Sequence, residues 1–142
     1  MNLPWKGVIP LAAMIRDRVG LAVALANKPH ARAMGEYVFG AAHGMRNFVI
    51  ISIGHGLGSF IFSNGIPYLG SDGYAGEVGH TMLYPHGRRC NCGNEGCLEV
   101  YTAAKGIVTT AQELMAKRSE PSLMRDIEKL SPRKIFECCE RG

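Results

Sequence analysis

The sequence predicts a layered α/β protein, and three features of the chain support this prediction. Two helical patterns come first, apolar runs of strand length occupy the middle, and helical patterns return in the last third. Of the 142 residues, 46% are hydrophobic and 20% are charged, which is typical of a globular protein. The sequence has no apolar run of roughly 18 residues, the length that a membrane span requires, so we expect no membrane partner.

The first part of the chain predicts two helices with a short strand between them. A spacing of four between apolar residues predicts a helix over residues 11–19. The apolar run over residues 21–25 predicts a strand. A proline at position 29 favours the start of a second helix, which we expect to end near residue 40. The buried face of this helix is expected to consist of Ala33, Met34, Tyr37 and Val38.

The middle of the chain predicts a β-hairpin and a loop, and the end predicts helices. Strands are predicted over residues 48–53, 59–63, 66–69 and, as a further candidate, 80–84. The dipeptide Asn64-Gly65 is a strong signal for a hairpin turn. Residues 70–79 contain four glycines and predict a shaped loop. Helices are predicted over residues 98–103, 106–117 and 131–139.

The distribution of the five cysteines indicates metal binding. Three of them lie in one glycine-rich loop, and a histidine precedes that loop. An odd number of cysteines in a chain without a leader indicates a reducing, cytoplasmic location rather than a disulfide framework. One imidazole and three thiolates make a closed tetrahedral set, so we expect a structural zinc ion on His80, Cys90, Cys92 and Cys97. The alternative is a group of reduced surface cysteines beside an unrelated histidine.

Two carboxylates flank this predicted metal site. A metal ion takes only one ring nitrogen of His80, so the other nitrogen remains available to donate to a polar ligand. Glu77 lies three residues before His80, and Glu99 lies two residues after Cys97. Because one carboxylate can accept hydrogen bonds from two hydroxyls, this set suits a polyhydroxylated ligand. The alternative is that both glutamates are solvated surface charges.

A glycine alternation follows the first predicted strand of the hairpin. Gly54, Gly56 and Gly58 allow backbone N–H groups to approach a phosphate. The segment after them is a predicted strand and not a helix, so they do not form a dinucleotide-binding fingerprint. A tight turn between paired strands explains these glycines equally well.

Taken together, these motifs resemble the ROK family (repressors, open reading frames and sugar kinases). The resemblance rests on Gly76-Glu77-Val78-Gly79-His80 and on the segment from Cys90 to Glu99, with further matches that include Gly56-Leu57-Gly58 and residues 5–11. It implies an actin-like ATPase (ribonuclease H-like) fold, of which this chain is a partial, central piece. Residues 1–45 would end the first lobe, and residues 46–142 would begin the second lobe, with the zinc loop at residues 80–99.

The resemblance also implies roles for individual residues. The zinc ligands of the family fall on His80, Cys90, Cys92 and Cys97. Its sugar contacts fall on Asn27, Glu77, His80 and Glu99. Its general base is an aspartate directly after the asparagine, and here that position is Lys28. A lysine that is protonated at pH 7 cannot accept the proton of a sugar hydroxyl.

The phosphate loop departs from the family pattern as well. His55 and Phe60 stand where kinases of the family usually have a threonine and a small residue. The bulk of Phe60 is expected to obstruct the approach of the backbone to a phosphate.

These departures leave two functions open. The first is a sugar sensor without kinase activity, the effector-binding part of a transcriptional regulator, and this is the function that we favour. It would bind a monosaccharide or sugar derivative and reach DNA only through an N-terminal domain missing from this chain. The second is an ATP-dependent hexose kinase of the glucokinase type, which would use ATP and Mg²⁺ and take Asp72 or Asp17 as its base. The resemblance suggests a homo-oligomer in either case.

Overall fold

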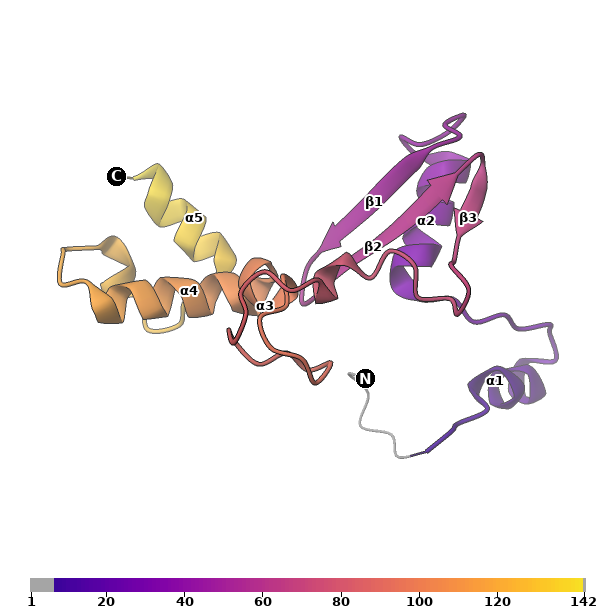
Figure 1. Ribbon diagram of the computed structural model, residues 1–142, viewed down its shortest axis with the longest axis horizontal. Helices are drawn as coiled ribbons and strands as arrows, with labels where there is room; N and C mark the ends of the chain where they lie inside the picture. The colour runs from indigo at the N-terminus through magenta and orange to yellow at the C-terminus, as the bar shows by residue number, and fades with distance from the viewer. Residues whose placement is uncertain (1–6, 142) are drawn as a thin grey trace.

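The computed structural model describes residues 7–141 as an α/β arrangement, which confirms the predicted fold class (Figure 1). Residues 1–6 and Gly142 lie outside the described part, and so does the start of the family resemblance at residue 5. The elements in chain order are α1 (Leu11–Val19), α2 (Lys28–Phe39), β1 (Phe48–Ile53), β2 (Leu57–Ser63), β3 (Ile66–Tyr68), η1 (Val78–His80), α3 (Glu99–Thr102), α4 (Ala104–Lys117), η2 (Leu123–Asp126) and α5 (Pro132–Glu140).

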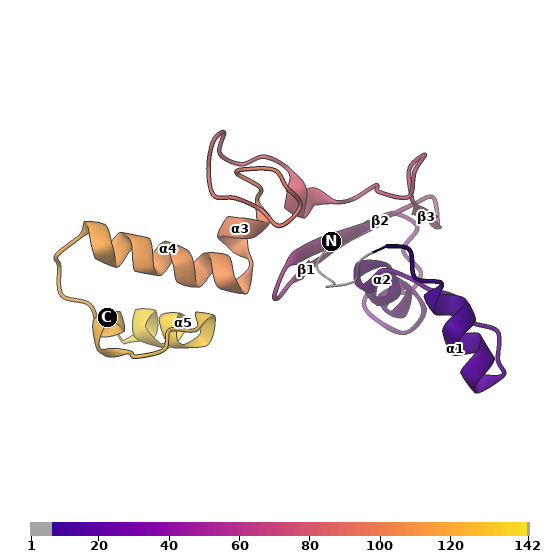
Figure 2. The same cartoon turned by 90° about the horizontal axis from the view of Figure 1, so that it is seen from below.

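The three strands form an antiparallel sheet in the order β1-β2-β3, with α2 against one face (Figures 1 and 2). Asn64 and Gly65 join β2 to β3 with φ values of 56° and 82°, as a type I′ hairpin turn requires. The helix α2 precedes residue 45 and packs on strands that follow it. The expected lobe boundary near residue 45 therefore runs through a packed layer, and the division into lobes stays a prediction.

Aromatic side chains form the core between α2 and the sheet. Ala33 of α2 is fully buried, and its small side chain lets the helix approach Phe60 and Phe62 of β2. The Phe62 ring stacks on Tyr37 and Phe48, with ring centroids 4.9 and 4.5 Å apart. This aromatic cluster therefore holds α2 against both β1 and β2.

The buried face of α2 differs in part from the prediction. Met34 and Val38 are exposed, whereas Ala33 is buried and Tyr37 is half-buried. Met34 follows Ala33, and Val38 follows Tyr37. One position along a helix is a rotation of about 100° around its axis. The sheet contacts only one stripe of α2, so the neighbouring stripe with Met34 and Val38 faces away from it.

Two predicted strands are absent from the described part of the chain. Residues 21–25 form no strand, because no other described strand lies beside them to complete a hydrogen-bond ladder. Residues 80–84 make only a single bridge, between Met82 and Cys97. The N–H groups of Leu83 and Tyr84 both point to the carbonyl of Gly96, because the chain turns here into the cysteine loop.

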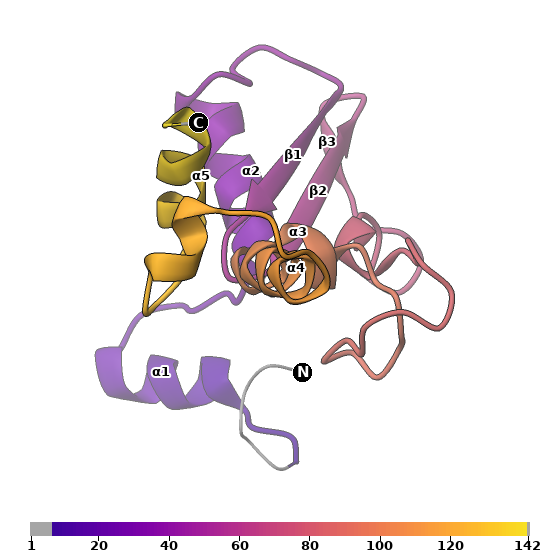
Figure 3. The ribbon, with the colours of Figure 1, turned by 90° about the vertical axis from the view of Figure 1, so that its left-hand side faces the viewer.

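The helices α3, α4 and α5 lie beyond the tip of the β1–β2 hairpin (Figures 1 and 3). The N–H of Ala104 at the start of α4 donates to the carbonyl of Gly54 over 2.8 Å and ties this helix to the turn between β1 and β2. The helix α5 packs on α4 and begins after Ser131, whose hydroxyl accepts a hydrogen bond from the N–H of Lys134. Between residues 7 and 141, no helix combines the length and apolar character needed to cross a bilayer.

Arg88 attaches the cysteine loop to α3 and α4. Its side chain is 18% exposed, and its guanidinium pairs with the Glu113 carboxylate at 2.7 Å and lies 4.6 Å from the centroid of the Tyr101 ring. The same guanidinium also donates hydrogen bonds to the carbonyls of Val100 and Gly106 and to the hydroxyl of Thr110. Arg88 thereby holds the base of the loop in place.

We expect Arg88→Ala to lower the free energy of unfolding by about 2–4 kcal/mol, because it removes hydrogen bonds from a charged donor to partly buried acceptors. The adjacent Arg89 is 92% exposed and lies 3.6 Å from Glu95, so Arg89→Ala is a matched control with an expected change of at most about 0.5 kcal/mol. Urea denaturation followed by circular dichroism measures both values. Equal losses in the two variants would contradict the role given to Arg88.

Candidate functional site

A pocket of about 460 Å³ lies where the start of α2, the β1–β2 turn, η1 and α3 meet, near the centre of Figure 1. It brings together residues that are far apart in the sequence, from position 27 to position 99. The residues predicted for a ligand site that line it are Asn27, Gly54, Gly56, Gly58, Glu77, His80 and Glu99. Lys28, at the position of the family's general base, lines it as well. Asn91, within the cysteine loop, completes one side.

The four predicted metal ligands form one cluster beside this pocket. One donor atom from each of His80, Cys90, Cys92 and Cys97 lies within 4.8 Å of all the others. The Sγ atoms of Cys92 and Cys97 are 3.6 Å apart, and Cys90 Sγ is 3.7 Å from His80 Nδ1. Two sulfurs bound tetrahedrally at about 2.3 Å from a zinc ion would be about 3.8 Å apart. The spacing and chemistry of these donors fit a tetrahedral zinc ion.

The protonation of the thiols reflects this crowding. Burial, and to a smaller extent the neighbouring thiols of Cys92 and Cys90, raise the pKa of Cys97 to about 12. A hydrogen bond from the backbone of Asn94 is the main cause that lowers the pKa of Cys92 below its usual value. A bound cation reverses the balance at such a cluster, because it favours every thiolate that faces it.

Backbone geometry closes the cysteine loop around these sulfurs. The N–H of Cys90 donates to the carbonyl of Asn94 over 2.8 Å, which curls the chain between the thiols. Gly96 has a φ of 75° and lies against Tyr84, where an added Cβ would be 1.7 Å from the carbonyl oxygen. Only glycine allows the two arms of the loop to come this close.

His80 belongs to both the cluster and the pocket. Its Nδ1 atom lies near Cys90 Sγ, and the ring is part of the pocket wall. The two nitrogens lie on different sides of an imidazole ring, so Nε2 remains free for a hydrogen bond to a ligand.

Glu99 connects α3 to the turn between β1 and β2. Its Oε2 atom accepts a hydrogen bond from the N–H of Leu57 over 2.8 Å. Gly56 makes room for this contact, because an added Cβ would be 2.6 Å from the same oxygen. The second carboxylate oxygen of Glu99 is available to a ligand in the pocket.

The glycine alternation forms a tight turn, the second of the two interpretations considered above. The N–H of Gly54 donates to the carbonyl of Gly56 over 2.9 Å, and β2 follows directly. The turn nevertheless forms one wall of the pocket. The expectation that Phe60 obstructs this wall is wrong, because its side chain is buried in the core and stacks on His30 at 4.4 Å. Alternation along β2 directs Phe60 toward α2.

The structure separates both candidate bases, Asp17 and Asp72, from this site and adds other residues to it. Asp17 is exposed in α1, where it pairs with Arg16 at 2.9 Å, and it is not among the residues that line the pocket. Asp72 is exposed in the loop after β3, where it accepts a hydrogen bond from the Ser71 hydroxyl over 2.9 Å, and it is not among the residues that line the pocket. Arg32 and Asn91 also line the pocket, although neither was predicted from the sequence. A usable signal was present for Arg32, which follows Lys28 by four positions and so shares its helix face.

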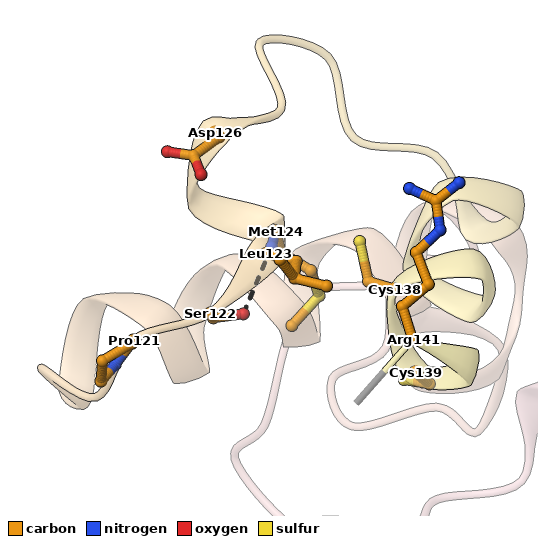
Figure 4. Close-up of a pocket in the computed structure, with 8 residues that line it drawn as sticks. All are labelled: Pro121, Ser122, Leu123, Met124, Asp126, Cys138, Cys139 and Arg141. Carbon is orange, nitrogen blue, oxygen red and sulfur yellow. Dashed lines mark hydrogen bonds between the residues drawn. The ribbon is translucent and has the colours of Figure 1, made fainter.

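A second cavity, of about 600 Å³, lies between η2 and α5 (Figure 4). Its labelled side chains include Cys138 and Cys139 of α5 and Asp126 of η2, which extends away from Arg141 in this view. None of the described residues that were predicted for a site lines this cavity. It therefore contains neither the cysteine–histidine cluster nor Glu77 and Glu99.

Comparisons with known proteins agree with this geometry. A sequence model described as the ROK family matches residues 1–142. The chain is 34% identical to a glucokinase from Halalkalibacterium halodurans over 99% of its own length and 43% of that protein. Among solved structures, a ROK family transcriptional regulator described as a homolog of the E. coli MLC protein has a TM-score of 0.79 and 36% identity, over 93% of this chain and 33% of that one.

A ROK family glucokinase from Streptomyces griseus in complex with glucose and AMPPNP has a TM-score of 0.73 and 36% identity, over 83% of this chain and 38% of that one. The chain thus spans less than half the length of each of these proteins. The shared fold is the actin-like ATPase fold, of which these residues form a part. The match over the whole chain and the likeness to both kinases and regulators lead to one conclusion: the chain belongs to the ROK family.

Proposed function

We propose that this chain is the sugar-binding, effector-sensing part of a ROK-family transcriptional regulator and that it has no kinase activity. The observation that carries the proposal is the position of His80, which faces the sulfurs on one side and lines a pocket shared with Asn27, Glu77 and Glu99. A ligand with several hydroxyls can satisfy all of these groups together.

Each of these residues has a distinct role in the proposed sugar site. Glu77 and the free oxygen of Glu99 accept hydrogen bonds from sugar hydroxyls. The Oδ1 atom of Asn27 accepts from the N–H of Lys28 over 2.9 Å at the start of α2, so its amide nitrogen is left to donate to the sugar. Nε2 of His80 donates a further hydrogen bond to the ligand.

In the same proposal, His80, Cys90, Cys92 and Cys97 hold a structural zinc ion. The ion contributes the attraction that a loop with few apolar residues lacks, on the order of 10–16 kcal/mol in zinc-finger peptides. The four side chains fill a tetrahedral shell, which leaves no position for catalysis. Their role is therefore to hold the loop at residues 80–99 and the ring of His80 in one orientation.

The absence of kinase activity follows from the residue beside Asn27. Lys28 lines the pocket in place of an aspartate, and a protonated amine cannot act as a general base. The alternative function is an ATP-dependent sugar kinase with ATP and Mg²⁺, and the 34% identity to a glucokinase favours it. That function needs another carboxylate at the reacting hydroxyl, and both Asp72 and Asp17 lie outside the pocket lining.

As a regulator, the protein would respond to sugar through its two lobes. We assign residues 1–45 to the end of the first lobe and residues 46–142 to the start of the second, so the pocket takes groups from both. A sugar that contacts both lobes stabilises one arrangement of the lobes. This change alters the affinity for DNA, which a separate domain outside these residues binds. We further propose a cytoplasmic homo-oligomer.

The first prediction concerns the metal. The purified chain should retain about one zinc ion, and Cys97→Ser should abolish its retention, because a buried thiolate of the shell is lost. Inductively coupled plasma mass spectrometry measures the zinc content. Cys138→Ser is the matched control, since Cys138 lies in α5 outside the cluster, and it should leave the content unchanged. An absence of zinc, or the same loss in both variants, would reject the site.

The second prediction concerns sugar binding. Glu77→Gln should weaken the binding of glucose about tenfold, because a charged hydrogen-bond acceptor becomes neutral while its size is kept. Isothermal titration calorimetry measures the dissociation constant. Glu120→Gln makes the same change at an exposed position away from the pocket and should have no effect. Equal affinities of the Glu77→Gln variant and the unchanged chain would remove Glu77 from the site.

The third prediction concerns catalysis. The chain should show no glucose-dependent ATP hydrolysis in a coupled assay, because Lys28 cannot accept the hydroxyl proton. Turnover that disappears on Asp72→Asn would instead support the kinase alternative and identify its base.

A further inference from the structure

We propose that the sugar bound in this pocket carries an anionic group, a phosphate or a carboxylate, and that Lys28 and Arg32 bind it. This inference rests on the proposed sugar-binding function and specifies the class of sugar.

The charges of the pocket lining are divided between two sides. Glu77 directly precedes η1 and Glu99 is the first residue of α3, beside the cysteine cluster. Lys28 and Arg32 come from α2 on the other side. A ligand that fits both sides has hydroxyls at one end and a negative charge at the other.

The two cations lie close together on one helix face. They are four positions apart along α2, the spacing at which side chains become neighbours and like charges repel each other. The N-terminal end of α2 adds partial positive charge at the same place. An anion between Lys28 and Arg32 would remove this repulsion.

Neither cation is neutralised by a carboxylate within residues 7–141, where the ion pairs of the structure involve other residues. Arg32 donates a hydrogen bond to the Ser52 hydroxyl, a neutral partner that also lines the pocket. The next carboxylate along α2, that of Glu36, is engaged elsewhere, since it accepts a hydrogen bond from the N–H of Ala41 over 2.9 Å. Both positive charges therefore remain available to a ligand.

The types of the side chains also match an anion. A guanidinium offers a planar pair of N–H donors that matches the oxygens of a phosphate or a carboxylate, and an ammonium adds a mobile point charge. His55, which lines the same pocket from the β1–β2 turn, adds a third polar side chain that can donate. A neutral sugar can accept hydrogen bonds from these donors, but it has no negative charge to balance theirs.

The experiment compares glucose, glucose 6-phosphate, glucuronate and inorganic phosphate by isothermal titration calorimetry with the 142-residue chain. We expect at least one anionic sugar to bind about tenfold or more tightly than glucose. Preference for glucose 6-phosphate identifies a phosphate, and preference for glucuronate identifies a carboxylate. Added salt should weaken the binding of the anionic sugar and leave the binding of glucose unchanged.

Variants of Lys28 and Arg32 test whether these two residues cause the preference for an anionic sugar. Lys28→Gln and Arg32→Gln should each reduce the affinity for the preferred anionic sugar about tenfold and reduce the affinity for glucose much less, because glucose has no negative charge to lose a partner. Retained glucose binding also reports that the variants are folded. Lys129→Gln removes one positive charge from an exposed loop position outside the pocket and should change neither affinity.

The outcomes separate this inference from the function on which it rests. Glucose binding as tight as that of both anionic sugars would overturn the inference and leave a neutral-sugar sensor. Inorganic phosphate binding as tightly as the sugar phosphate would overturn it too, because the hydroxyl side would then contribute nothing. Failure of every probe to bind would reject the proposed sugar-binding function itself.

Discussion

The site depends on one imidazole ring that meets two requirements at once. Nδ1 of His80 lies 3.7 Å from Cys90 Sγ, and the same ring forms part of the pocket wall. The ring cannot turn away from the sulfurs without also moving its other nitrogen in the pocket. The shape of the ligand site is thereby coupled to the closure of the cysteine loop, and Arg88 connects that closure to α3 and α4.

Two close approaches of the backbone bring the remaining pocket residues together. Gly58 lies against Pro29 at the start of α2, where an added Cβ would be 2.6 Å from the proline Cγ. Gly56 in turn lies against the carboxylate of Glu99. The β1–β2 turn is thus held between α2 and α3. Because Gly56 and Gly58 have no side chains, Asn27 and Glu99 can lie around one cavity.

The proposed sensor and a kinase share this frame and differ in the charges within it. A kinase needs a carboxylate beside the reacting hydroxyl, and the lining contributed by α2 is instead positive, with Lys28 and Arg32. The carboxylates remain on the side of η1 and α3, where they suit hydroxyl binding rather than proton removal from a hydroxyl near α2. In this interpretation, a single replacement, Lys28 in place of the aspartate, both removes the general base and adds a group that binds an anion.

The sequence alone determined the antiparallel hairpin, most of the helices, the grouping of His80 with Cys90, Cys92 and Cys97, and the family, because periodicity, turn residues and ligand spacing act over a few neighbouring positions. The tertiary structure decided which surfaces meet. It exposed Met34 and Val38, left residues 21–25 without a strand partner, turned Phe60 into the core, kept Asp72 away from the pocket and added Arg32 to it. These outcomes depend on packing between distant segments, whose contacts no local pattern of residues specifies.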